Sequence, residues 1–196
     1  MNLRLFSSTF TSLILSVSIS AQTQIYDIIS KKDTLGMVTV SKSNKENITY
    51  YHYNVDMTAK LLINVHMKYM IKATYVSGYL LSASVQNMVN GKPYHSNEIN
   101  WQDTYYSITS KSKKQQKVLE KINYSGIRLF FDEPREIKKV FSEYTGQFGN
   151  IQKINANSYE LTLHNGKKNK YHYHQNILEK ATINNSLIHF DLILRK

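Results

Sequence analysis

Cysteine is absent from the 196-residue chain. Its absence excludes disulfide bonds, a lipid-anchored cysteine, thiolate catalysis and cysteine-based metal sites. Proline and tryptophan are scarce, with 2 and 1 residues, and glycine occurs only 7 times. Because several of these glycines fall at turn positions, few remain for a loop that could cradle a phosphate group.

Residues 1–21 have the features of a secretory signal peptide. Arg4 supplies the positive charge, an apolar stretch interrupted by serines follows, and Ala21 is the expected last residue before cleavage. The alternative is an amphipathic N-terminal helix of the mature domain. No later apolar run is long enough to span a bilayer. We therefore expect residues 22–196 to form one exported domain, periplasmic or secreted, that is not transmembrane.

Signatures of catalysis and of nucleic-acid recognition are also missing. The chain contains no G-x-S-x-G, no H-E-x-x-H and no dinucleotide fingerprint, so the common hydrolase, metalloprotease and nucleotide-binding classes lack support. The net charge is +11, but an exported chain without a recognition motif is a poor partner for nucleic acid. We expect no enzyme activity and no cofactor.

Tyrosine is the abundant aromatic residue, with 15 Tyr against 7 Phe. Tyrosine suits the half-buried pleated surface of a sheet. Apolar and polar residues alternate with a period of two in many short segments, for example between Ile63 and Lys72, which is typical of half-buried strands. Turn signals at even spacing predict an all-β fold, a strongly curved antiparallel sheet or barrel of about 11 strands.

Turn chemistry predicts the pairing of one hairpin. A two-residue loop at Ser77-Gly78 would set Ile71 opposite Ser84 and bury polar groups, whereas a three-residue loop that includes Tyr79 sets Ile71 opposite Val85. We therefore predict the longer loop, with Gly78 at the positive-φ position.

The stretch from Ser125 to Gly149 breaks the alternation. Ile127 and the run from Leu129 to Phe131 crowd together just before Asp-Glu-Pro, where proline prevents an element from continuing. We predict a short helix over Ser125–Phe131, capped by the Ser125 hydroxyl, that plugs the hollow of the curved sheet with apolar side chains.

Few polar residues suggest a reactive or metal-binding site. His172 and His174 project from one face of a predicted strand, a spacing that can serve a metal, but no third ligand is forced nearby. Asp132, Glu133 and Glu143 flank the break and could form an acid–base pair, as in a glycan hydrolase, although Asp-Glu-Pro is ordinary turn composition. We therefore assign no catalytic and no metal-binding residue, and the ligand-binding residues stay open.

Lysines gather in two stretches, which are ordinarily solvated turn flanks. They could also attract an anionic envelope surface such as lipid headgroups. The members are Lys111, Lys113, Lys114, Lys117 and Lys121 in the first stretch and Lys167, Lys168 and Lys170 in the second.

Several short motifs resemble those of a domain-of-unknown-function family of small exported bacterial proteins. They are Ile25–Ile29, Leu129–Pro134, Val140–Glu143, Gly146-x-Phe148, Tyr159-x-Leu161 and Gly166-Lys167-Lys168-Asn169-x-Tyr171-x-Tyr173. The resemblance implies an exported, mostly β protein and carries no catalytic residues. More distantly, the architecture is similar to the curled sheet with helical plug of periplasmic lipoprotein carriers.

These observations favour a non-enzymatic envelope protein that binds a lipid or other hydrophobic ligand in its curved sheet, since such ligands bind in concave apolar cavities. The alternative is a structural or protein-interaction module of the envelope that has no small-molecule ligand.

Overall fold

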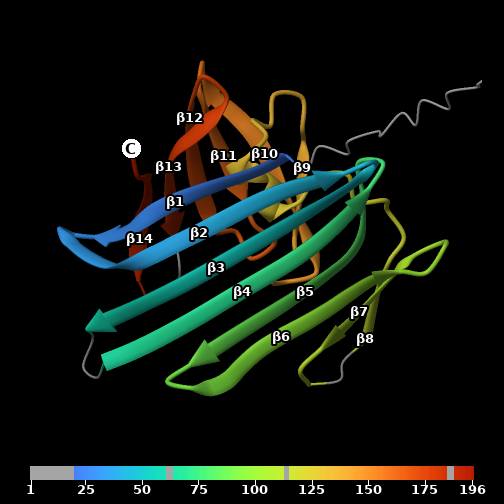
Figure 1. The fold of residues 1–196 in the computed structure, drawn as a ribbon, viewed down its shortest axis with the longest axis horizontal. Helices are drawn as coiled ribbons and strands as arrows, with labels where there is room; N and C mark the ends of the chain where they lie inside the picture. Colours follow the sequence, from blue (N-terminus) through green and yellow to red (C-terminus); the bar gives the residue numbers. More distant parts are fainter. Residues whose placement is uncertain (1–19, 61–63, 113–114, 185–187) are drawn as a thin grey trace, which may run out of the picture.

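The computed structural model describes residues 20–60, 64–112, 115–184 and 188–196 (Figure 1). Within them the chain forms 14 strands: β1 (Ser20–Ser30), β2 (Asp33–Lys45), β3 (Ile48–Lys60), β4 (Asn64–Val76), β5 (Tyr79–Val89), β6 (Lys92–Trp101), β7 (Tyr106–Ser110), β8 (Gln115–Val118), β9 (Lys139–Ser142), β10 (Gln147–Asn155), β11 (Ser158–Thr162), β12 (Lys168–His174), β13 (Ile177–Asn184) and β14 (His189–Leu194).

All 14 strands belong to one antiparallel sheet in the order β8-β7-β6-β5-β4-β3-β2-β1-β14-β13-β12-β11-β10-β9. Except for β8 and β9, consecutive strands along the chain are neighbours in the sheet, and β1 pairs with β14 to join the two halves. The all-β antiparallel prediction is confirmed. The predicted number of about 11 strands is wrong, because the described chain forms 14 strands, of which β8 and β9 have only four residues each.

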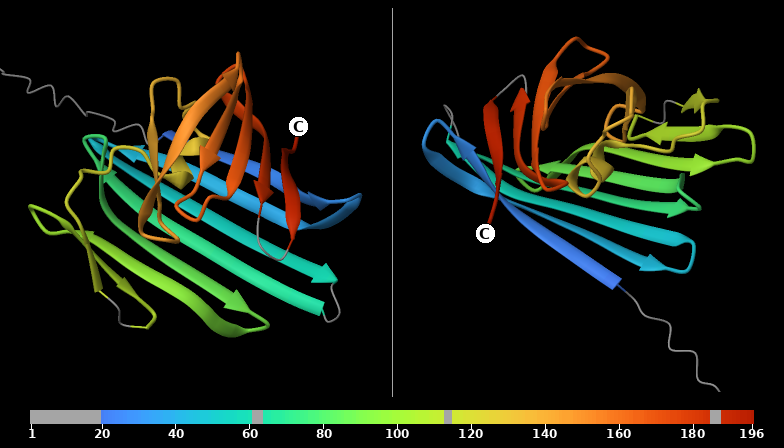
Figure 2. Two further views of the ribbon diagram at one scale, coloured as in Figure 1. Left: turned by 180° about the vertical axis from the view of Figure 1, so that it is seen from behind. Right: turned by 90° about the horizontal axis from the view of Figure 1, so that it is seen from above.

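The sheet is rolled but not closed. Figure 2 shows β1–β6 as a broad layer and the C-terminal strands arching over it. The edge strands β8 and β9 do not pair with each other. Instead, the turn after β9 packs inside the roll, where the Asn97 amide donates to the carbonyls of Glu143 (3.0 Å) and Tyr144 (2.7 Å), and the Gln116 amide donates to that of Gly146 (2.9 Å).

Alternation along the strands separates a buried concave side from a polar outer face. In β12, for example, Asn169, Tyr171 and Tyr173 are buried while the residues between them are exposed. The core therefore lies inside the roll. It includes the fully buried Tyr26, Tyr75, Tyr106, Tyr159, Tyr173 and Phe141.

The central break forms a short 3-10 helix, η1 (Gly126–Phe130), inside the roll. Ile127, Leu129 and Phe130 are buried, and the Phe130 ring lies 5.3 Å from the rings of both Tyr26 and Tyr53. The chain thus fills its own hollow as predicted. The expected cap is wrong, because Ser125 makes no side-chain bond to the helix and its hydroxyl donates to Glu143 instead.

The β4–β5 hairpin confirms the predicted pairing of Ile71 with Val85. The predicted three-residue loop is wrong, and so is the pairing of Tyr75 with Leu81 that it implied, because Tyr75 lies opposite Leu80. Ile71 lies opposite Val85, yet the loop contains only Ser77 and Gly78, with φ of 48° and 84°. The register shifts at a β-bulge between Thr74 and Tyr75. Because a bulge adds one residue to one strand, it restores the pairing that a two-residue loop alone would have lost.

Residues 1–19 of the predicted signal peptide lie outside the described residues, and β1 begins at Ser20. In the described chain, no helix has the length and apolar character that crossing a bilayer would require.

Candidate functional site

A chain of hydrogen bonds runs through the interior beside η1. The Tyr75 hydroxyl donates to the Ser125 hydroxyl (2.6 Å), which donates to the Glu143 carboxylate (2.5 Å). The same carboxylate oxygen accepts the backbone N–H of Ile127 (3.3 Å). All three side chains in this chain are almost completely buried. Burial raises the pKa of Glu143, and hydrogen bonds from Ser125 and the backbone oppose that rise.

This buried network is a structural feature of the roll. It joins strand β4, the start of η1 and the end of β9, which belong to different parts of the chain. The three side chains hydrogen-bond to one another. Glu143 is only 2% exposed, so its carboxylate is not accessible to a substrate. A buried, satisfied polar network specifies how the surrounding elements dock.

Asp132 takes part in a separate, half-buried ion cluster. Its carboxylate accepts from Arg128 at 2.9 Å and from Lys42 at 3.2 Å. The Arg128 guanidinium also lies over the rings of Tyr75 (5.5 Å) and Tyr124 (5.2 Å). Asp132 therefore anchors the end of η1 to β2.

Glu133 has a third set of partners. Its carboxylate accepts from the Tyr159 hydroxyl at 2.8 Å and from Arg135 at 3.1 Å. Asp132, Glu133 and Glu143 thus occupy three different environments and share no hydrogen-bond partner. The arrangement does not favour an acid–base pair, in which two carboxyl groups flank one bond.

His172 and His174 both lie exposed on the outer face of β12, as their spacing predicted. The Nδ1 atom of His172 is 2.9 Å from the Ser158 hydroxyl. Across the described ranges, no group of three or more histidine, aspartate or glutamate residues is placed to hold a metal ion.

The first lysine stretch is split between the two ends of the sheet. Lys111 bonds the Pro93 carbonyl beside the β5–β6 hairpin, whereas Lys117 and Lys121 lie at the other end over aromatic rings. Lys113 and Lys114 are outside the described residues. In the second stretch, Lys168 pairs with Glu160 at 2.8 Å, and Lys170 is exposed beside it.

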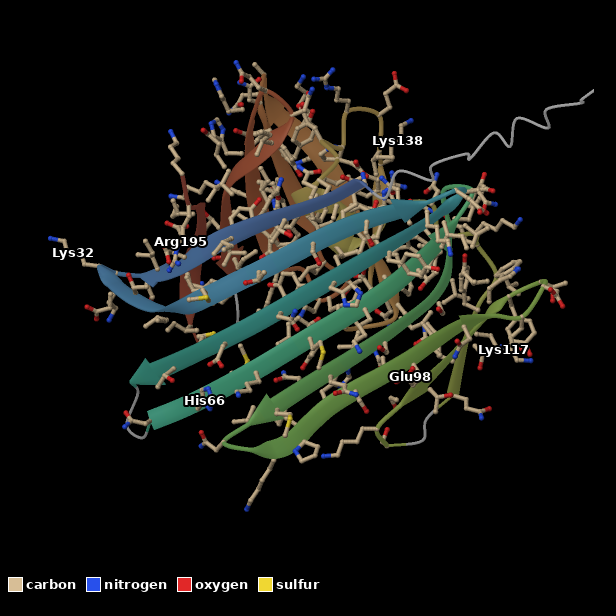
Figure 3. The ribbon with its side chains drawn as sticks, viewed as in Figure 1. Lys32, His66, Glu98, Lys117, Lys138 and Arg195 are labelled. Atoms are coloured by element: carbon tan, nitrogen blue, oxygen red, sulfur yellow. The ribbon has the colours of Figure 1, made fainter. Side chains whose placement is uncertain are left out.

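A groove lined by both apolar and polar side chains lies on the outer face of the sheet. It crosses β2 to β5, has a volume of about 320 Å³, and includes Met37, Met70 and Met88 in its lining. Lys68 and Asp56 lie at the groove, 3.7 Å apart, and Asp56 also pairs with His66. Figure 3 shows His66 on the same broad layer of strands. We call this feature the methionine groove.

A second hollow is polar. It has a volume of about 430 Å³ and lies among the β10–β11 turn, the β12–β13 turn and the loop after η1. Glu133, Arg135, Asn157 and Asn176 are among its lining residues, and Arg135 is already bonded to both Glu133 and Asn176. Glu133 and Arg135 therefore neutralise each other, and Lys153 adds one further positive charge to the lining.

Comparison with known proteins identifies the family. The model of a domain of unknown function, DUF6134, matches residues 26–195. The chain belongs to the DUF6134 family. The resemblance to a family of unknown function is thereby confirmed, whereas export and the likeness to lipoprotein carriers stay predictions. No curated protein matches the sequence of this DUF6134 member.

A solved structure shares the fold. The crystal structure of a beta-barrel-like protein of domain of unknown function DUF1849 from Brucella abortus has a TM-score of 0.64 with this chain, at 9% sequence identity. The match covers 92% of this chain and 98% of that chain. At this identity the similarity concerns the fold alone, so no residue role is transferred.

Sequence reasoning missed the methionine groove, although one signal was present. Met70 lies between Lys68 and Lys72 in the strand alternation, so an apolar residue falls on the polar face. The convergence of Met37 and Met88 on the same place depends on the register of four strands, which alternation within one strand does not specify.

Proposed function

We propose that this protein is a non-enzymatic binding protein of the cell envelope, and that it holds the acyl chain of a lipid or fatty acid in the methionine groove. The observation that supports the proposal is a groove of about 320 Å³ on the outer sheet face, whose open surface is mainly apolar and includes Met37, Met70 and Met88. Ligand sites are mostly apolar hollows of roughly 300–1,000 Å³ with a few polar groups, so the groove matches a small ligand or one acyl chain.

The residues of the groove suit this class of ligand. Methionine is unbranched and polarisable, so it adapts to chains of different length and shape. Lys68 provides a cation at the groove for a carboxylate or phosphate headgroup, although Asp56 competes for it at 3.7 Å. The ligand would thus lie on the outer face, because Phe130 and its neighbours already fill the concave side.

The envelope location rests on the predicted signal peptide and on the lack of cysteine. Fractionation of cells that express the full chain should place a shortened product in the periplasm or medium. Its N-terminal sequence should begin near Gln22. A full-length cytoplasmic product would contradict export without affecting the groove.

The filled concave side favours a second candidate, a structural or protein-interaction module without a small ligand. The two candidates differ in whether a ligand co-purifies with the protein. Native mass spectrometry of protein isolated from its own envelope should show an additional lipid-sized mass under the first proposal. A clean apo species would support the second candidate.

A variant test assigns the ligand to the groove. The double variant Met37→Lys, Met88→Lys should lose both the additional mass and the uptake of a fluorescent fatty acid, since both lining side chains then become charged. Thr74→Lys with Ser84→Lys is the matched control, because it also adds two lysines to the outer face of β4 and β5 but outside the groove. Equal uptake by the double variant and the control would overturn the assignment.

A further inference from the structure

One end of the sheet carries a group of aromatic, aliphatic and basic side chains, of which Trp101 and Tyr105 are half-buried and the others are exposed. The β4–β5 turn, the β6–β7 turn and the end of β8 meet there. We call this group the aromatic–lysine end. Its members are Tyr79, Trp101, Tyr105, Lys117, Leu119 and Lys121.

The members are held together by cation–aromatic contacts. The Lys121 ammonium lies 5.2 Å from the centre of the Tyr79 ring and 5.4 Å from that of Trp101. The Lys117 ammonium lies 4.5 Å from the centre of the Tyr105 ring. Such contacts are favourable within about 6 Å, and they place each cation beside an apolar surface.

This end also exposes large apolar side chains to water. Leu119 is 77% exposed and Tyr79 is 46% exposed. Burial of apolar surface stabilises the folded state, so a leucine that stays this exposed contributes little to the stability of the fold. Exposed apolar groups next to one another mark an interaction surface more often than isolated ones do.

The acidic groups nearby offset the two lysines only in part. Glu120 is paired with Lys139 at 2.9 Å, whereas Asp103 adds one negative charge at the exposed tip of the β6–β7 turn. Lys117 and Lys121 contact rings, and the chain as a whole carries a net charge of +11. The end therefore offers cations to an anionic partner.

We propose that the aromatic–lysine end docks on the surface of an anionic lipid bilayer. Tryptophan and tyrosine prefer the boundary between headgroups and acyl chains, and lysine stems follow apolar surface while the ammonium reaches the headgroups. An exposed leucine adds burial in the same layer. This surface is at the turn end of the sheet, and the inference does not depend on a ligand in the methionine groove.

The chain contains its own reporter for this contact. Trp101 is the only tryptophan, and it lies directly under Lys121. On adding vesicles of phosphatidylglycerol mixed with phosphatidylcholine, the full chain should sediment with them and its fluorescence should shift to the blue. Phosphatidylcholine vesicles alone should bind it weakly, and added salt should weaken binding to the anionic vesicles.

Variants separate this end from the overall charge. Each lysine near an anionic surface strengthens binding roughly 5-fold, so Lys117→Gln with Lys121→Gln should weaken it about 25-fold. Leu119→Ser should reduce both binding and the blue shift. The matched control is Lys32→Gln with Lys92→Gln, which removes the same charge at the opposite end of the strands, where Figure 3 labels Lys32.

The expected result is weaker binding in the first two variants and unchanged binding in the control, with unchanged thermal unfolding in all three. Absence of sedimentation with anionic vesicles would overturn the proposal. So would an equal loss in the control, which would mean that net charge alone attracts the protein.

Discussion

The concave side and the outer face of this sheet are made by alternate residues of the same strands, yet they follow different rules. On the concave side, side chains such as Tyr75 and Tyr173 are buried and their hydroxyl groups find partners inside the protein. On the outer face, the polar surface is interrupted by the methionine groove. The difference indicates that the concave side determines stability, and that the outer surfaces are available for binding.

The largest effect should come from Phe141→Ala. Phe141 has no exposed surface, and its ring lies 5.3 Å from that of Phe148. Removing a buried aromatic ring costs about 3–5 kcal/mol of unfolding free energy. Chemical denaturation measures this loss. The control Tyr94→Ala removes an aromatic side chain that is 64% exposed and should cost less than about 1 kcal/mol; similar losses in both variants would contradict the comparison.

Ser125→Ala should have the next largest effect. The hydroxyl accepts from Tyr75 and donates to Glu143, so its removal leaves two buried groups short of a partner. The expected cost is about 1–3 kcal/mol in denaturation. Ser84→Ala, on the outer face of β5, should change stability little. If both serines behave alike, the buried network does not stabilise the roll.

The interior carboxylate should make stability fall as pH rises. Burial raises the pKa of Glu143 above its ordinary value of 4.5, so above that pH the folded state holds a proton that the unfolded state has lost. Its contribution is fully present below pH 4.5 and is lost as pH rises through the raised pKa. Glu143→Gln should remove this decline. Denaturation midpoints across a pH series measure it, and parallel profiles for the two proteins would refute the assignment.

The smallest effect, of opposite sign, is expected on the outside. A hydrogen bond from Arg195 lowers the pKa of Asp27 below its ordinary value of 3.8. The stability from this pair is therefore present above pH 3.8 and is lost as pH falls through the lowered pKa. Arg195→Ala should destabilise the protein slightly at neutral pH, since exposed ion pairs contribute little. The same pH series should show the two proteins converging in acid.

Much of the fold could be predicted from local patterns. Alternation in β12 places Tyr171 and Tyr173 inside and His172 outside, and the apolar run before Pro134 indicates the plug. The candidate groove could not be predicted in this way. Met37 and Met88 are 51 positions apart in the chain, and only the pairing of β2, β3, β4 and β5 brings them to one place.

The sequence by itself determined the all-β class, the turn positions and the side chains that face inward, because these depend on neighbours one or two positions away. The tertiary structure alone decided that the sheet rolls without closing and that Ser125 bonds Glu143 instead of capping η1. It also decided that Lys111 and Lys117 lie at opposite ends of the sheet. These outcomes depend on register and on contacts between distant strands. A single bulge shifts register by one residue, so such contacts follow only from the complete packing.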